Sequence, residues 1–115
     1  KEDSQLPFIV MPDAVRAIFD LMNTDKNKLT QYIYNITSFT QSTHHFYLKI
    51  KDYYPHFEMI YDIDSERQRI VDSWPNNIDD NKARLDWGWK PKYDFDNAYA
   101  KYIIPEIKNL IQKII

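Results

Sequence analysis

Apolar residues recur first at strand spacing and then at helical spacing near the start of the chain. Residues 6–10 form a short continuous apolar run, which predicts a buried strand of a parallel sheet. Pro12 suits the first turn of a helix, where its missing N–H is not needed. We expect that helix to bury one apolar stripe, composed of Val15, Ile18, Phe19 and Met22.

The middle of the chain alternates between strand-like and helix-like patterns. Residues 32–36 and 57–61 are rich in β-branched and aromatic side chains, and each run predicts a further strand. Between them, Thr40 is the expected N-cap of a helix. Pro55 should end that helix, because proline disfavours helical geometry at the residue before it. Strands that alternate with helices predict an α/β lobe with too few strands to form a nucleotide-binding sheet.

The most distinctive segment, residues 67–95, holds the single glycine and all three tryptophans. Asp79 is a good N-cap for a short helix that carries Ala83 and Trp87 on one face. Gly88 is then expected to adopt the left-handed conformation that ends the helix. Such a sharp stop fixes the directions of Trp87 and Trp89, for which we expect a packing role.

The end of the chain predicts one more helix. Asp94 or Asp96 is the expected N-cap, and Pro105 should kink the helix or split it in two. The apolar seam of this helix consists of Tyr99, Ile103, Ile107, Leu110 and Ile114.

Composition excludes several classes of protein. The 115 residues suit one domain at most, and a net charge of −2 without a basic stripe argues against a nucleic-acid partner. The absence of cysteine excludes a disulfide scaffold and a thiolate zinc site. No apolar run approaches the roughly 20 residues that span a bilayer, and no segment has the pattern of a secretion signal.

Candidate chemistry within the chain is sparse. A dinucleotide-binding turn needs several glycines, so one glycine cannot provide it and we expect no NAD-binding residues here. Tyr47 and Lys51 have the Tyr-x-x-x-Lys spacing of dehydrogenases, but we interpret the match as coincidence. His44, His45 and His56 lack the spacing of a metal site, and we expect no bound metal and no catalytic residue.

The segments DSWP (72–75), IDD (78–80) and DWGW (86–89) resemble the C-terminal region of the L-threonine 3-dehydrogenases. These enzymes belong to the extended short-chain dehydrogenase/reductase family, which also includes nucleotide-sugar epimerases and dehydratases. The looser family pattern matches Lys82, Ala83, Gly88, Trp89 and Pro91. The resemblance extends over residues 6–104, and it begins deep inside the family's sequence.

The resemblance implies a fold and a domain assignment. Residues 1–115 would be the α/β, C-terminal substrate-binding lobe of a Rossmann-type fold that lacks most of the nucleotide-binding sheet. Residues 6–24 would be the strand and helix that cross over from the nucleotide-binding domain. Residues 25–115 would form the substrate lobe and the C-terminal helix. We therefore expect the chain to be a piece of a longer enzyme.

The resemblance also implies an activity. The parent would oxidise L-threonine to L-2-amino-3-oxobutanoate by hydride transfer to NAD, which the missing N-terminal part would bind. It would be a homodimer, mitochondrial in a eukaryote and otherwise cytoplasmic, and the piece alone would be inactive. Two alternatives stay open: the lobe of a nucleotide-sugar epimerase or dehydratase, and an interaction module without catalysis.

Two residues are candidates for substrate binding. Trp74 lies on an expected loop before Pro75, and from the residues alone it could either pack or close a pocket. By the resemblance, Trp74 lies at the threonine pocket. Arg67 would hold the substrate diphosphate in an epimerase. In a threonine enzyme Arg67 would instead pair with Asp72 or Asp79 and support the loop, and Arg84 would have a similar structural role.

Overall fold

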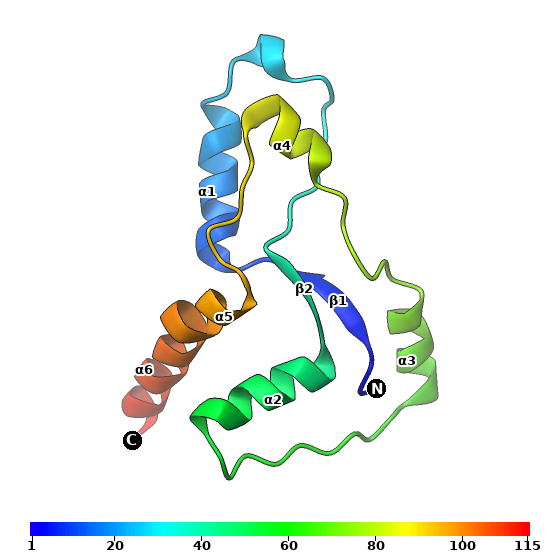
Figure 1. Cartoon of the computed structure of the whole chain (residues 1–115), viewed down its shortest axis with the longest axis vertical. Helices are drawn as coiled ribbons and strands as arrows, with labels where there is room; N and C mark the ends of the chain where they lie inside the picture. Colours follow the sequence, from blue (N-terminus) through cyan, green and yellow to red (C-terminus); the bar gives the residue numbers. More distant parts are fainter.

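A computed structural model describes all residues, 1–115, and shows the mixed α/β fold that the sequence predicts (Figure 1). The sheet has two strands, β1 (Gln5–Phe8) and β2 (Phe39–Ser42), with Gln5 opposite Ser42. The strands are antiparallel. The prediction of a buried strand in a parallel sheet is therefore wrong for β1, because its one neighbour in this chain runs the other way.

Helix α1 (Met11–Met22) forms where expected, with Pro12 in its first turn. The face that is buried, however, is not the one that the sequence predicts. Asp13 and Ala17 are buried, at 0% and 2% exposure, because their face packs on the segment that follows α4. The predicted apolar stripe is open instead, with exposures between 46% and 75% for Val15, Ile18, Phe19 and Met22. The expectation that this stripe is buried is wrong within this chain.

Three predictions for the middle of the chain are also wrong. Residues 32–36 and 57–61 form no strand, because no neighbouring strand is present to pair with them. Thr40 lies inside β2 instead of capping a helix. Ser42 is the N-cap of α2 (Thr43–Tyr53), and its side chain accepts a hydrogen bond from the His45 N–H. The predicted end of this helix before Pro55 is confirmed.

The remaining elements are helical. They are η1 (Lys26–Lys28), α3 (Ser65–Asp72), α4 (Asn81–Trp87), α5 (Phe95–Ala98), the π-helical η2 (Tyr99–Ile103) and α6 (Ile104–Ile114). Asp94 caps α5 as predicted, accepting from the Asn97 N–H at 2.7 Å. The predicted interruption by Pro105 takes the form of the π-helical turn immediately before α6. All these helices are too short or too polar to traverse a membrane.

The molecule is flat, with extents of 52 × 36 × 22 Å, and it buries only 9 of its 115 residues. One small core forms where α1 meets the end of α4, around Ala17, Ala83 and Trp89. A second apolar group joins the sheet to α2 and α5 through aromatic rings. Its members are Phe8, Phe39, Phe46, Phe95 and Tyr99. Helix α3 lies apart from both groups, beside the start of β1 (Figure 1).

Candidate functional site

Trp74 lies on the loop that follows α3, as the sequence predicts. Helix α3 ends at Asp72, and the Trp74 N–H still donates to the Val71 carbonyl at 3.1 Å. Pro75 then prevents any continuation of the helix. The Trp74 side chain is 52% exposed and pairs with no other aromatic ring. It is therefore not buried in this chain's core, and a broad apolar surface stays available to a ligand or to another part of the protein.

Arg67 lies on α3 and is largely free. Its side chain is 87% exposed, and its Nε lies 3.7 Å from the Oδ2 of Asp64, the N-cap of α3. The expected pairing of Arg67 with Asp72 or Asp79 is wrong. Asp64 lies three residues earlier on the same helix, within easier reach. A solvent-exposed pair of this kind contributes little to stability.

Two side-chain hydrogen bonds attach the Trp74 segment to the sheet. Before Trp74, the Gln68 Nε2 on α3 donates to the Ser4 Oγ at 2.9 Å, immediately ahead of β1. After Trp74, the Thr40 Oγ1 on β2 donates to the Asn77 Oδ1 at 3.0 Å. Sequence reasoning missed both contacts, because the paired residues are 64 and 37 positions apart.

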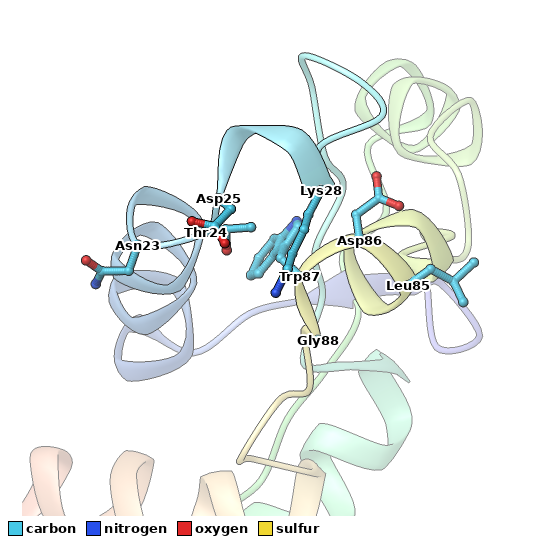
Figure 2. A pocket seen from close by; sticks show the side chains of 8 residues that line it. All are labelled: Asn23, Thr24, Asp25, Lys28, Leu85, Asp86, Trp87 and Gly88. Carbon is cyan, nitrogen blue, oxygen red and sulfur yellow. The ribbon is translucent and has the colours of Figure 1, made fainter.

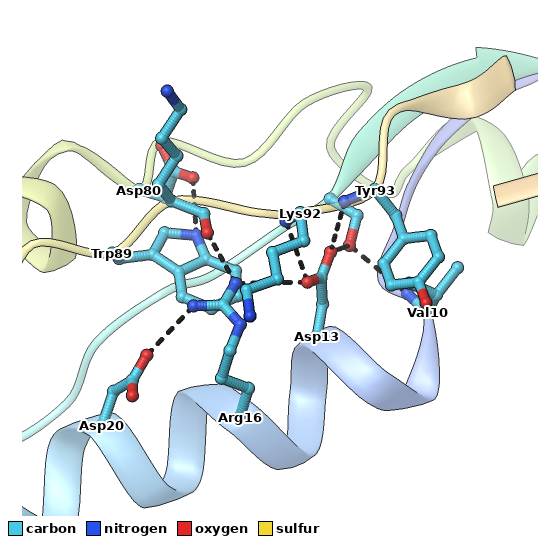
Figure 3. A network of polar contacts seen from close by, with 10 residues as sticks. Val10, Asp13, Arg16, Asp20, Asp80, Trp89, Lys92 and Tyr93 are labelled. Atoms are coloured by element: carbon cyan, nitrogen blue, oxygen red, sulfur yellow. Dashed lines mark hydrogen bonds and ion pairs between the residues drawn. The ribbon is translucent and has the colours of Figure 1, made fainter. Parts of the chain in front are cut away.

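Asp13 connects α1 to the segment between α4 and α5 (Figure 3). Its buried carboxylate accepts from the backbone N–H groups of Lys92 and Tyr93, at 3.0 and 3.2 Å, and from the Ser38 hydroxyl at 2.8 Å. Burial raises the pKa of Asp13, but the hydrogen bonds from Lys92, Ser38, Arg16 and Tyr93 outweigh it and hold the pKa below its usual value. The sequence reasoning missed these contacts, because the partners of Asp13 lie 25, 79 and 80 positions away along the chain.

Asp80 connects the two ends of α4 (Figure 3). Its carboxylate accepts hydrogen bonds from the Trp89 indole N–H at 3.1 Å and from the Arg84 Nε at 2.7 Å. Gly88 has φ of 72°, so the predicted left-handed helix end is confirmed. Trp89 is 2% exposed, and its ring centroid lies 5.8 Å from that of Trp87. The predicted packing role of both tryptophans and the structural role of Arg84 are confirmed.

A cavity of about 590 Å³ opens between the end of α4 and residues 23–28 (Figure 2). Figure 2 shows the Trp87 indole turned toward the segment that carries Thr24 and Lys28. The indole Nε1 of Trp87 is buried without a hydrogen-bond acceptor. Neither Trp74 nor Arg67 lines this cavity. The two sequence-predicted site residues thus share the α3 region, away from this cavity.

The histidines do not converge. His44 lies 3.0 Å from Glu2, and the His45 Nδ1 lies 3.0 Å from the Ser42 Oγ. No group of three or more histidine, aspartate or glutamate side chains is arranged to hold a metal ion. The Lys51 ammonium lies over the Tyr47 ring at 5.4 Å, and both residues are partly buried on α2.

No protein-family model matches the chain. Among curated proteins, an uncharacterized epimerase/dehydratase of Staphylococcus saprophyticus is 38% identical over 93% of this chain and 33% of its own length. The mitochondrial L-threonine 3-dehydrogenase of Bos taurus is 36% identical over 84% of this chain and 25% of its own length. Among solved structures, the holo form of the GalE-like L-threonine dehydrogenase from Cupriavidus necator is 37% identical. Its TM-score is 0.85, over 96% of this chain and 34% of that one.

These matches give the chain's relatives. The chain is similar to the C-terminal part of L-threonine 3-dehydrogenases and epimerase/dehydratases, and its fold is that of the C-terminal part of GalE-like, extended short-chain threonine dehydrogenases. It corresponds to the C-terminal part of these proteins and spans between 24% and 33% of the length of the curated relatives it matches. The family places the chain among relatives of an oxidoreductase. The exposed apolar stripe of α1 and the small, two-stranded sheet are consistent with relatives that are about three times as long as this chain.

Proposed function

We propose that this chain is the substrate-side lobe of an NAD-dependent L-threonine 3-dehydrogenase. The enzyme would oxidise the threonine hydroxyl to the ketone of L-2-amino-3-oxobutanoate, while a hydride passes to NAD and a proton to a base. The observation that carries this proposal is the likeness to solved L-threonine dehydrogenases, which extends over 95% or more of the chain.

Trp74 is the residue that we assign to the substrate. Its indole is half exposed on a loop and has no aromatic neighbour in this chain, which favours a wall of a pocket over a core role. An indole that covers bound threonine would exclude water from the reacting carbon, and it would add apolar contact to a small polar substrate. Arg67 would lie beside this pocket and would not touch the substrate.

NAD would be bound by the part of the enzyme outside this chain. The lone glycine, Gly88, ends α4 in the left-handed conformation, so it does not form the strand-to-helix turn that receives a pyrophosphate. The open stripe of α1 would be covered by that same missing part, since four large apolar side chains rarely stay solvated on one helix face. The catalytic base would also belong there.

The compartment and assembly that we propose are those of the family resemblance. The bovine relative is named as mitochondrial, so the parent would be mitochondrial in a eukaryote and cytoplasmic elsewhere. A homodimer would form through the missing part, although one solved relative is described as monomeric.

A nucleotide-sugar epimerase or dehydratase is the second candidate. Two relatives from Staphylococcus that are named uncharacterized epimerase/dehydratase are 38% and 39% identical to the chain, compared with 36% and 37% for two mammalian L-threonine 3-dehydrogenases. The free guanidinium of Arg67 could hold a diphosphate through paired charge-assisted hydrogen bonds. This alternative predicts a different substrate for the same lobe.

The test is turnover by the purified full-length protein. We expect NADH to appear with L-threonine and NAD, and we expect no conversion of a UDP-hexose. L-serine is the matched control, because it keeps the amino-acid groups and lacks only the methyl group. Epimerisation or dehydration of the UDP-hexose without threonine oxidation would establish the second candidate instead.

A further inference from the structure

The loop that carries Trp74 is attached to the sheet on both sides of the indole. Gln68 holds α3 to Ser4 at 2.9 Å, six residues before Trp74. Asn77 accepts from the Thr40 hydroxyl at 3.0 Å, three residues after it. Ser4 directly precedes β1, and Thr40 lies opposite Pro7 of β1 within β2. Because the two strands pair in a fixed register, the two attachment points are held at a fixed separation.

Little else restrains the indole. Trp74 makes one backbone hydrogen bond, to Val71, and its ring has no aromatic neighbour. Between Trp74 and Asn77 the chain has little freedom, since Pro75 has a fixed φ. The Thr40–Asn77 bond is therefore the first tertiary side-chain contact after Trp74, while on the other side Asp72 pairs with Lys1 at 3.5 Å, with both side chains more than 40% exposed.

We propose that Asn77 is a positioning residue for the reaction, and that it acts through Trp74. Its side-chain oxygen accepts a hydrogen bond from Thr40 on β2, and this bond holds the loop where the indole can cover bound threonine. This inference rests on the proposed function, because it assigns a purpose to a loop of the same site. It adds a residue pair, Thr40 and Asn77, to which the sequence patterns assign no role in substrate binding.

The structure supplies a matched control. Asn76 is adjacent in sequence and of the same residue type, but its side chain makes no hydrogen bond. It lines a polar cavity of about 440 Å³ next to Asp72. If position in the loop alone mattered, changes at Asn76 and Asn77 would have similar effects. If the bond to Thr40 matters, only Asn77 responds.

The experiment compares variants of the full-length enzyme with L-threonine and NAD. Asn77→Ala and Thr40→Val should each lower kcat/KM for threonine about three- to tenfold, the effect of losing one neutral hydrogen bond. KM for NAD should not change. Asn77→Asp and Thr40→Ser keep an acceptor and a donor, respectively, so both should retain the wild-type value. The double variant, Thr40→Val with Asn77→Ala, should be no worse than either single variant.

Three results would overturn the proposal. Asn77→Ala could behave like Asn76→Ala, or the two single losses could multiply in the double variant. The losses could also appear only as a lower melting temperature, with kcat/KM per active site unchanged, which would mean a purely structural contact.

If Asn77→Ala fails to fold, Thr40→Val tests the same hydrogen bond by removing its donor. A wild-type enzyme that does not oxidise threonine would refute the proposed function itself. Normal turnover that is sensitive to Trp74 and insensitive to Asn77 would refute only this inference.

Discussion

The indole N–H of Trp89 donates to the Oδ2 of Asp80 at 3.1 Å, and so the residue after the lone glycine is bound to the residue before α4. The same carboxylate pairs with Arg84, which lies on the helix between them. One side chain therefore fixes both ends of α4 and the direction in which the chain leaves Gly88. The position of α4 against α1 depends on this arrangement.

Asp80→Ala should lower the free energy of unfolding by about 2–3 kcal/mol, because the Trp89 N–H would be buried without an acceptor and Arg84 would lose its carboxylate. Chemical denaturation measures the change. Glu58→Ala is the control, since Glu58 is exposed and its side chain makes no hydrogen bond or ion pair. A loss below about 0.5 kcal/mol, equal to the control, would contradict the structural role of Asp80.

The lowered pKa of Asp13 predicts that the folded chain loses stability in acid. Its pKa is lower in the folded chain than the ordinary value of 3.8, so its contribution to stability is complete above that value. The contribution is lost as the pH falls through the folded pKa. Asp13→Asn should be less stable near neutral pH and should lose less stability between about pH 4 and pH 2. The measurement is the free energy of unfolding as a function of pH, and parallel curves for wild type and variant would count against this account.

Substitutions at Gly88 should change stability through the backbone conformation alone. Its φ is 72°, and an added Cβ would meet no atom within 4 Å. Gly88→Ala should therefore cost about 1 kcal/mol of conformational strain alone, and Gly88→Asn should cost less, because asparagine tolerates the left-handed region. Thermal denaturation of the two variants distinguishes the cases. An alanine variant as stable as wild type would show that the chain does not need this conformation.

Local signals predicted several helix ends correctly, although two predicted N-caps were wrong: Ser42 instead of Thr40 begins α2, and Asp80 instead of Asp79 begins α4. Pro12, Pro55 and Gly88 each restrict the backbone by their own geometry, so their effects do not depend on the rest of the fold. Asp94 likewise caps α5 through groups only three residues away. The resemblance to the family also rested on short, contiguous segments, and it is confirmed.

Predictions that depended on distant neighbours were wrong. Residues 32–36 have a strand-like composition, but Tyr34 and Ile36 are used to pack on the small core without any backbone pairing. The stripe of α1 has the spacing of a buried face, and no covering layer is present in this chain. For the candidate site, the loop of Trp74 could be predicted from Pro75. The bonds of Asn77 and Gln68 to the sheet could not be predicted, because no local rule links residues so far apart.

Arg67 distinguishes the two candidate substrates. In a full-length threonine enzyme Arg67→Ala should change KM for threonine by no more than a few-fold, since its only ion pair is with Asp64 on the surface. In an epimerase the same change would remove a charge-assisted contact to phosphate, and nucleotide-sugar binding would weaken about tenfold or more. Steady-state kinetics with both substrates decide the matter, and Arg69→Ala on the same helix is the control for loss of charge.

The kinetic effect of Trp74→Ala in the full-length enzyme tests the central claim most directly. Because Trp74 is 52% exposed, the variant should stay folded, and its melting temperature should fall little. The account predicts that kcat/KM for L-threonine falls at least about tenfold, that KM for NAD does not change, and that Trp74→Phe recovers part of the loss. A variant that is destabilised but turns threonine over normally per folded molecule would contradict the assignment of this lobe to the threonine pocket.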